Sequence, residues 1–149
     1  MTAFRRILYP TDFSRASAPA LRRAVALARA CRAPLVLLHV MTPPSPFIGE
    51  DAPPGSYADL LLLARRSAKR RLAAVFGRVR RTGVRVEAIF AEGLPVDEIL
   101  RAARRARADL IVMGTHGRTG VSRAFMGSVA ERVVRESRCP VLTVRAHGR

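Results

Sequence analysis

Short apolar runs alternate with longer amphipathic segments along almost the whole chain, and this alternation most constrains the fold. Five runs are predicted to be strands, at residues 7–9, 35–40, 84–91, 110–113 and 141–144. The first two are predicted to be buried, whereas 84–91 has β-branched residues and alternates at Arg85 and Glu87. Four segments between them space their apolar residues as one helical face, at about 17–31, about 57–81, from 95 onward and about 128–137. Strict alternation of strand and helix predicts a parallel sheet with helices on both faces.

Size and composition fit one globular domain. The chain has 149 residues, of which 49% are apolar and 26% charged, and these values exclude disorder. A proline-rich loop is predicted at 41–56, too short to divide domains, so 1–149 is predicted to form a single domain. The first ten residues contain charges but neither an apolar h-region nor an A-x-A site, so we expect no secretory signal, and no apolar run approaches the roughly 20 residues of a membrane span. We expect a cytoplasmic protein without membrane attachment.

The charge of the chain is unusual. Lys and Arg total 27 against 11 Asp and Glu, a formal net charge of +16, and Lys69 is the single lysine. A positive charge of this size makes nucleic-acid binding a candidate function. However, aromatic residues are only 5%, which leaves few stacking platforms, and the arginines are spread over every predicted helix. Nucleic-acid binding is therefore retained only as an alternative.

A glycine-rich segment follows the apolar run 110–113 and gives the best signal of function. Gly114, Gly117 and Gly127 follow the pattern G-x-x-G, nine residues, G, and Ser128 comes next. Glycine lets backbone N–H groups approach a ligand closely, and a helix starting at Ser128 adds free N–H groups and a positive dipole end. The pattern predicts a phosphate-binding loop; the alternative is that these glycines only make turns. It is neither a Walker A motif nor G-x-G-x-x-G.

Three motifs in order resemble the universal stress protein family, in its nucleotide-binding branch. They are Ile7-Leu-Tyr-Pro-Thr-Asp-Phe-Ser14, Ala108-Asp-Leu-Ile-Val-Met-Gly-Thr-His-Gly117 and Arg138-Cys-Pro-Val-Leu-Thr-Val144, and the glycine pattern that ends at Gly127 and Ser128 belongs to the same resemblance. The resemblance covers nearly the whole chain. It implies a doubly wound, Rossmann-like sheet of the adenine nucleotide alpha hydrolase-like type, with strand order 3-2-1-4-5.

The resemblance also implies an ATP site where the strand order reverses. Asp12 would lie beside the ribose and adenosine, Val40 would offer backbone groups to adenine, and the glycines with Ser128 would hold the ribose and phosphates. The complete set of expected binding residues is Pro10, Thr11, Asp12, Val40, Met113, Gly114, His116, Gly117, Arg118, Gly127, Ser128 and Val129. Mg²⁺ is expected to accompany the phosphates, and a homodimer is expected to pair through the last strand: Val141, Leu142, Thr143 and Val144.

Several of these residues also have simpler interpretations. Asp12 is placed to cap the following helix, and Arg118 and Arg123 either pair with phosphate or project into water. His116 is interpreted as a loop residue rather than a general base, and His39, among apolar neighbours, as a satisfied core histidine. The sequence shows no catalytic pair and no cluster of metal ligands.

Three functions follow from these observations. We expect an ATP-binding, dimeric stress-response module that is not an enzyme. The alternatives are a slow ATP hydrolase or related adenylate-handling enzyme, and a basic nucleic-acid-binding protein. One structural test accompanies the implied strand order: Cys31 and Cys139 would precede strands three positions apart, roughly 14 Å at about 4.8 Å per strand. A disulfide between them is therefore predicted to be absent.

Overall fold

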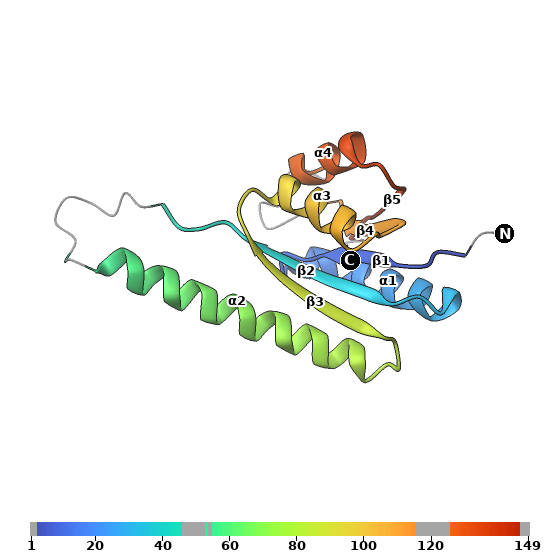
Figure 1. The fold of residues 1–149 in the computed structure, drawn as a ribbon, viewed down its shortest axis with the longest axis horizontal. Helices are drawn as coiled ribbons and strands as arrows, with labels where there is room; N and C mark the ends of the chain where they lie inside the picture. The colour runs from blue at the N-terminus through green and yellow to red at the C-terminus, as the bar shows by residue number, and fades with distance from the viewer. Residues whose placement is uncertain (1–2, 46–52, 54, 116–125, 147–149) are drawn as a thin grey trace.

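A parallel sheet organises the molecule, with its strands in the order β3-β2-β1-β4-β5 (Figure 1). The computed structural model describes residues 3–45, 53, 55–115 and 126–146. The elements are β1 (Ile7–Pro10), the 3₁₀ turn η1 (Arg15–Ser17), α1 (Ala18–Cys31), β2 (Leu35–Met41), α2 (Ser56–Arg80), β3 (Val86–Glu92), α3 (Pro95–Arg105), β4 (Leu110–Gly114), α4 (Ser128–Glu136) and β5 (Val141–Val144). The predicted fold class and strand order are confirmed.

The strand order reverses between β1 and β4. Every neighbouring pair is parallel, and Ile7 of β1 lies opposite Leu35 of β2 on one side and Leu110 of β4 on the other. The chain therefore leaves β1 toward one edge of the sheet and later returns to the opposite side of the same strand. At such a reversal the connections leave a crevice outside the carboxyl ends of the strands.

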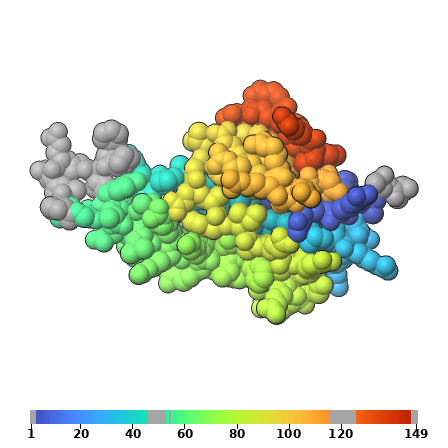
Figure 2. All heavy atoms as spheres, in the orientation of Figure 1, coloured from blue at the N-terminus to red at the C-terminus, as the bar shows by residue number. Residues whose placement is uncertain are grey.

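Two helices cover each face of the sheet. Alternate residues of the strands point to opposite faces, so Ile7, Tyr9 and Leu37 pack with α1 and α2, whereas Leu8, Val36 and Leu38 pack with α3 and α4. In the space-filling view, α2 lies on one side of the molecule and α3 and α4 on the other (Figure 2). Each central strand is buried on both faces, which explains why its sequence is almost continuously apolar.

Helix α2 meets the sheet over only part of its length. Ala68, Leu72 and Val75 are buried as its periodicity predicts, and Val79 with them. Leu61, which shares the helical spacing of these apolar residues, is only half-buried, because the N-terminal part of α2 extends past the strands (Figure 1). The apolar spacing is right for a helix, but it cannot indicate where the sheet ends.

The cysteines agree with the strand order. Cys31 packs against the cluster beneath α1 and α2, whereas Cys139 packs against the cluster beneath α3 and α4. Both thiols are free, as predicted, and the sheet separates them. Among the helices in the described part of the chain, none is long and apolar enough to cross a membrane.

Candidate binding cleft at the strand-order reversal

A cleft of about 710 Å³ lies outside the carboxyl ends of β1, β2 and β4. The start of α4 and one side of α2 complete its walls. Those residues of the predicted ATP site that the structure describes all line it: Pro10, Thr11, Asp12, Val40, Met113, Gly114, Gly127, Ser128 and Val129. His116, Gly117 and Arg118 lie outside the described residues, as does Arg123. Segments far apart in sequence therefore meet in one concavity.

Side-chain hydrogen bonds build the turn that follows β1. The Thr11 N–H donates to the Leu38 carbonyl at 2.8 Å, which extends the pairing with β2 by one residue. The Phe13 N–H then donates to Thr11 Oγ1 at 3.0 Å. These bonds turn the chain away from the sheet and leave Asp12 at the cleft wall.

Asp12 does not cap α1, so that simpler interpretation is wrong. Its Oδ1 accepts the Ser14 N–H at 2.9 Å, the local turn that aspartate favours. Ser14 instead caps η1, with its Oγ accepting the Ser17 N–H at 3.3 Å. Because η1 lies between the turn and α1, Asp12 is too far back along the chain to reach the first turn of α1.

Phe13 adopts an unusual backbone conformation at the cleft. Its φ is +62°, a left-handed value that costs a residue with a Cβ roughly 1–2 kcal/mol. The ring stacks on His39 with centroids 4.2 Å apart, and the Arg71 guanidinium lies 4.7 Å from the ring centroid. The Arg71 Nη2 also donates to the Phe13 carbonyl at 3.3 Å. Strained residues held by such contacts cluster at functional sites.

His39 is a satisfied core histidine, as predicted. It is buried in β2, and its Nδ1 lies 2.8 Å from the Thr11 carbonyl. A carbonyl oxygen only accepts, so Nδ1 donates and carries the proton. Besides this core role, His39 forms part of the cleft wall.

Tyr9 lies on β1, the strand that pairs with β2. Burial raises the pKa of its phenol above the ordinary value, and its hydroxyl donates to the Ser17 carbonyl at 3.0 Å.

The first turn of α4 opens into the cleft. Two backbone hydrogen bonds fix it there: the Gly127 N–H donates to the Thr115 carbonyl at 2.7 Å, and the Thr115 N–H donates to the Val144 carbonyl at 3.1 Å. The N-cap residue is Gly127, and within the described chain no side chain caps the helix. The N–H groups of this turn, with the positive end of the helix dipole, can therefore serve an anion.

Helix α2 supplies a wall that sequence reasoning missed. Ala64, Ser67 and Arg71 line the cleft from this helix, yet nothing in the α2 sequence marks them. Beside the cleft, Arg65 forms a bidentate ion pair with Glu92 at the end of β3, with Nε–Oε1 and Nη2–Oε2 distances of 2.6 and 2.9 Å. The Arg65 guanidinium lowers the pKa of the Glu92 carboxyl below its ordinary value.

The described residues contain no group of three or more His, Cys, Asp or Glu side chains that could hold a metal ion. What the cleft offers is a carboxylate at the end of β1, backbone at the ends of β2 and β4, and a glycine-capped helix N-terminus. A doubly wound sheet with such a cleft at its switch point defines a class of ligand-binding α/β proteins.

Comparison with known proteins identifies the family within that class. Residues 3–145 match the model of the universal stress protein family, and the chain belongs to that family. It is 37% identical to a universal stress protein of Methanocaldococcus jannaschii over 95% of this chain and 82% of that protein. It is 38% identical to one from Thermus aquaticus over 95% of this chain and 99% of that protein.

Solved structures agree with this assignment. Universal stress protein UspA from Lactobacillus plantarum superposes with a TM-score of 0.82 at 26% identity, covering 97% of this chain and all of that one. A universal stress protein solved in complex with cAMP superposes with a TM-score of 0.72, also at 26% identity, covering 97% of this chain and 98% of that one.

Proposed function

We propose that this chain binds ATP with Mg²⁺ in the cleft and acts in the cytoplasm as a nucleotide-responsive module of the stress response. The observation that carries the proposal is the glycine-capped first turn of α4, which opens into the cleft beside Gly114. Family membership supports it, as does the cAMP complex of the structural neighbour, because cAMP and ATP share the adenosine group.

The proposed arrangement follows the chemistry of the walls. Adenosine lies between the ends of β1 and β2, where Asp12 accepts from the ribose hydroxyls and the backbone of Val40 meets adenine. The phosphates lie toward Gly114, Gly127 and Ser128, where the N–H groups of α4 and its dipole favour negative charge. Gly117, His116 and Arg118 belong to the same proposed loop. Mg²⁺ would partly neutralise the phosphates, with the phosphate oxygens themselves as ligands.

The substitution Ser128→Glu tests the phosphate position. Ser128 is exposed at the start of α4, where a carboxylate suits the helix dipole by about 0.3–1 kcal/mol, so the variant should fold. The same charge would repel ATP phosphates. Wild type should gain about 2.7 kcal/mol of stability at a hundredfold excess of ATP over Kd, and Ser128→Glu should lose most of that gain in a thermal-shift titration with Mg²⁺.

Ala58→Glu is the matched control. Ala58 is exposed in the first turn of α2 and lies away from the cleft lining, so it receives the same charge in the first turn of a helix. It should keep the full ATP-dependent shift. Equal shifts in the two variants, or no shift in wild type, would exclude the proposed site. Adenosine, which carries no phosphate, is titrated alongside and separates adenosine recognition from phosphate recognition, because only the latter depends on Ser128→Glu.

We also propose that the chain is a binding module rather than an enzyme. The carboxylate and the imidazole in the described cleft wall both have structural hydrogen bonds: Asp12 Oδ1 accepts from Ser14, and His39 Nδ1 donates to Thr11. Phosphate release from ATP and Mg²⁺ should match a blank without protein. Turnover above the blank that His116→Ala abolishes would overturn this proposal in favour of a slow ATP hydrolase.

Finally, we propose that two copies pair through β5. This strand pairs with β4 along one side and forms an edge of the sheet. Leu142 on it is 38% exposed. An exposed apolar edge strand invites pairing with another chain, and a dimer would cover it.

A further inference from the structure

The positive charge is concentrated on one face of the sheet. Along the chain the arginines occur in every helix, but the acidic residues do not. Helices α1 and α2 together carry ten basic side chains and a single acidic one, Asp59: Arg22, Arg23, Arg29, Arg65, Arg66, Lys69, Arg70, Arg71, Arg78 and Arg80. Helices α3 and α4 carry five basic and four acidic: Arg101, Arg104, Arg105, Arg132, Arg135, Asp97, Glu98, Glu131 and Glu136.

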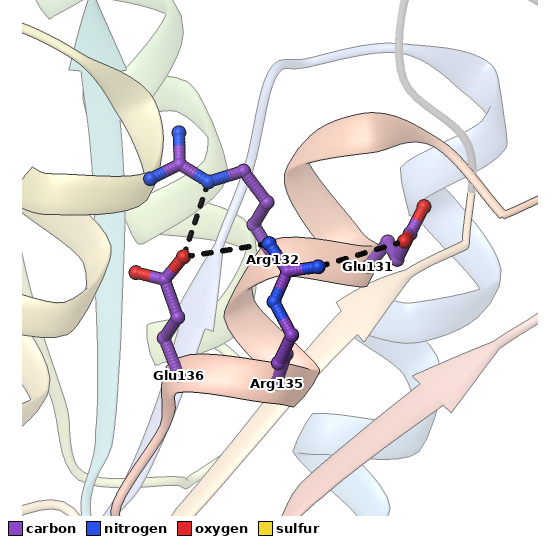
Figure 3. Close-up of polar contacts among 4 residues, drawn as sticks. All are labelled: Glu131, Arg132, Arg135 and Glu136. Carbon is purple, nitrogen blue, oxygen red and sulfur yellow. Dashed lines mark hydrogen bonds and ion pairs between the residues drawn. The ribbon is translucent and has the colours of Figure 1, made fainter.

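Helix α4 illustrates how the other face is neutralised. Arg132 Nε lies 3.2 Å from Glu136 Oε1, and Arg135 lies 4.0 Å from Glu131 and 3.8 Å from Glu136 (Figure 3). On α3, Arg101 pairs with Glu98. Exposed pairs of this kind stabilise the fold little, but they cancel charge locally. Helices α1 and α2 have only one carboxylate between them, that of Asp59, so most of their charge is not cancelled in this way.

A groove of about 1090 Å³ runs between α1 and the C-terminal half of α2, and we call it the arginine groove. Leu21 and Val25 of α1 and Val75 of α2 give it an apolar lining. Several of the lining residues have small side chains that leave the groove open: Ala26, Ala73, Ala74 and Gly77. Five arginines border it: Arg22, Arg29, Arg71, Arg78 and Arg81.

The arginines of the groove are not neutralised by the described protein. Its described lining contains no Asp or Glu. Arg71 contacts the Phe13 carbonyl and ring, which leaves its charge uncompensated. Arg22, Arg29, Arg78 and Arg81 form no ion pair with any carboxylate in the described part of the chain. An apolar channel bordered by unpaired cations is complementary to a ligand that is apolar on one side and acidic on its flanks.

We propose that the arginine groove binds an acidic amphipathic helix from a protein partner. The apolar stripe of that helix would pack on the half-buried side chains of Leu21 and Val25, while Glu or Asp on either side would pair with the arginines. The groove follows α2 from Arg71 to Val79 and continues past the end of that helix to Arg81 and Thr82. The helical part is roughly 12 Å long at 1.5 Å per residue, which suits about two helical turns. This inference is independent of the proposed ATP site.

Other occupants fit less well. A second copy of this chain would bring another +16 of formal charge against the same arginines. A nucleic acid would use aromatic faces for stacking, but Tyr9 in this groove is 1% exposed and the Phe13 ring is already engaged by His39 and Arg71. The apolar lining would also remain uncovered by a phosphate backbone.

The test measures binding of a labelled peptide of about 15 residues, long enough for a short helix. It has Leu at positions i, i+3, i+4 and i+7, Glu on either side of that stripe, and Ala elsewhere to avoid repulsion between like charges. A scrambled peptide of identical composition, without the apolar stripe, is the first control. A single-stranded DNA oligonucleotide is the second. Fluorescence anisotropy should show that the patterned peptide binds at least about tenfold more tightly than the scrambled one, because the apolar stripe adds to charge attraction.

Two variants with equal charge change locate the binding. Arg22→Glu with Arg78→Glu reverses charges of the groove, whereas Arg104→Glu with Arg105→Glu reverses two on α3. The first pair should weaken the patterned peptide on the order of tenfold, and the second should have little effect. Ala74→Trp, which fills the groove at an exposed position, should also weaken it without changing net charge.

Three outcomes would overturn the proposal. The patterned and scrambled peptides could bind equally, which would mean attraction by charge alone. The α3 pair could weaken binding as much as the groove pair, which would place the peptide elsewhere. The oligonucleotide could bind more tightly than the peptide and lose affinity in the groove variants, which would assign the groove to nucleic acid.

Discussion

Gly93 and Gly77 show how the same residue type serves different ends. Gly93 follows β3 with φ +145°, and a Cβ built there would lie 3.3 Å from the Cγ and Oε1 atoms of Glu98. Gly77 is helical within α2, and its added Cβ would meet only Arg81 Nη1, at 3.7 Å. Gly93 is therefore needed for its backbone conformation, whereas Gly77 only lowers the helix propensity of α2.

Alanine at these two positions should change stability in opposite directions. Gly93→Ala forces a disfavoured φ and should lower the free energy of unfolding by more than about 1 kcal/mol. Gly77→Ala should raise it by roughly 0.5–1 kcal/mol. Urea denaturation of the two variants beside wild type measures both changes. A stabilised Gly93→Ala would contradict the backbone geometry at the start of α3.

The Arg65–Glu92 pair predicts a pH-dependent contribution to stability. The guanidinium lowers the pKa of Glu92 in the folded protein, so the pair stabilises the fold above the unfolded pKa of the carboxyl, which is about 4.3. That contribution is lost as the pH falls through the lowered, folded pKa. Arg65→Met should therefore reduce Tm at neutral pH, and the difference from wild type should disappear in acid.

Arg66→Met is the control for that measurement. Arg66 is exposed on the same turn of α2, and removing it takes away the same charge without touching Glu92. Its Tm difference from wild type should not follow the titration of Glu92. A pH profile that is the same for both variants would mean that general charge, rather than the pair, controls stability here.

At the scale of elements, the predictable features are those set by neighbours in sequence. The central strands are apolar because both faces are covered, and α3 and α4 have one apolar side each, so their positions follow from local pattern. The predicted start of β3 is wrong, because the strand begins at Val86 rather than at 84. Val84 is buried in the turn that precedes the strand, and burial alone cannot distinguish a turn residue from a strand residue.

The edge strand β5 gives a prediction about assembly. Leu142→Glu places a charge on the exposed side of this strand, where pairing with a second chain would bring two such charges together. Light scattering after size-exclusion chromatography should find a dimer for wild type and a monomer for the variant, with similar circular dichroism spectra. Val134→Glu, an exposed apolar position on α4, is the matched control and should remain dimeric. A wild-type monomer would exclude the proposed pairing.

At the scale of the whole molecule, the sequence predicts the walls of the cleft that the strand ends and α4 supply, but not the wall that α2 supplies. The turn after β1 and the glycines around α4 could be placed together because parallel strands bring their carboxyl ends to one edge. Arg71 and its neighbours on α2 could not, because they reach the cleft only through the way α2 lies across the sheet. The same reason hid the arginine groove: its two walls are about fifty residues apart in sequence, and the spread of arginine over all helices concealed their unequal neutralisation.

The cleft and the arginine groove share a wall, since Thr11, Phe13, Ser17 and Arg71 line both. If ATP occupies one and an acidic helix the other, both anions draw on the charge of Arg71, so the two should oppose each other. Saturating ATP should raise the Kd of the patterned peptide by a factor of about five or more. The peptide must then raise the Kd of ATP by the same factor, and Arg71→Met should reduce the effect. A factor of one would show the sites to be independent.

The unequal charge of the two faces has a further consequence before any contact is made. A sheet with a strongly cationic layer on one side and a nearly neutral layer on the other carries an electric dipole across its thickness. In the electric field of an anionic partner, such a molecule rotates so that its α1–α2 face points toward the partner, and collisions are then oriented rather than random. Association would then be faster than shape alone allows, and salt would slow it as the Debye length shrinks below about 10 Å.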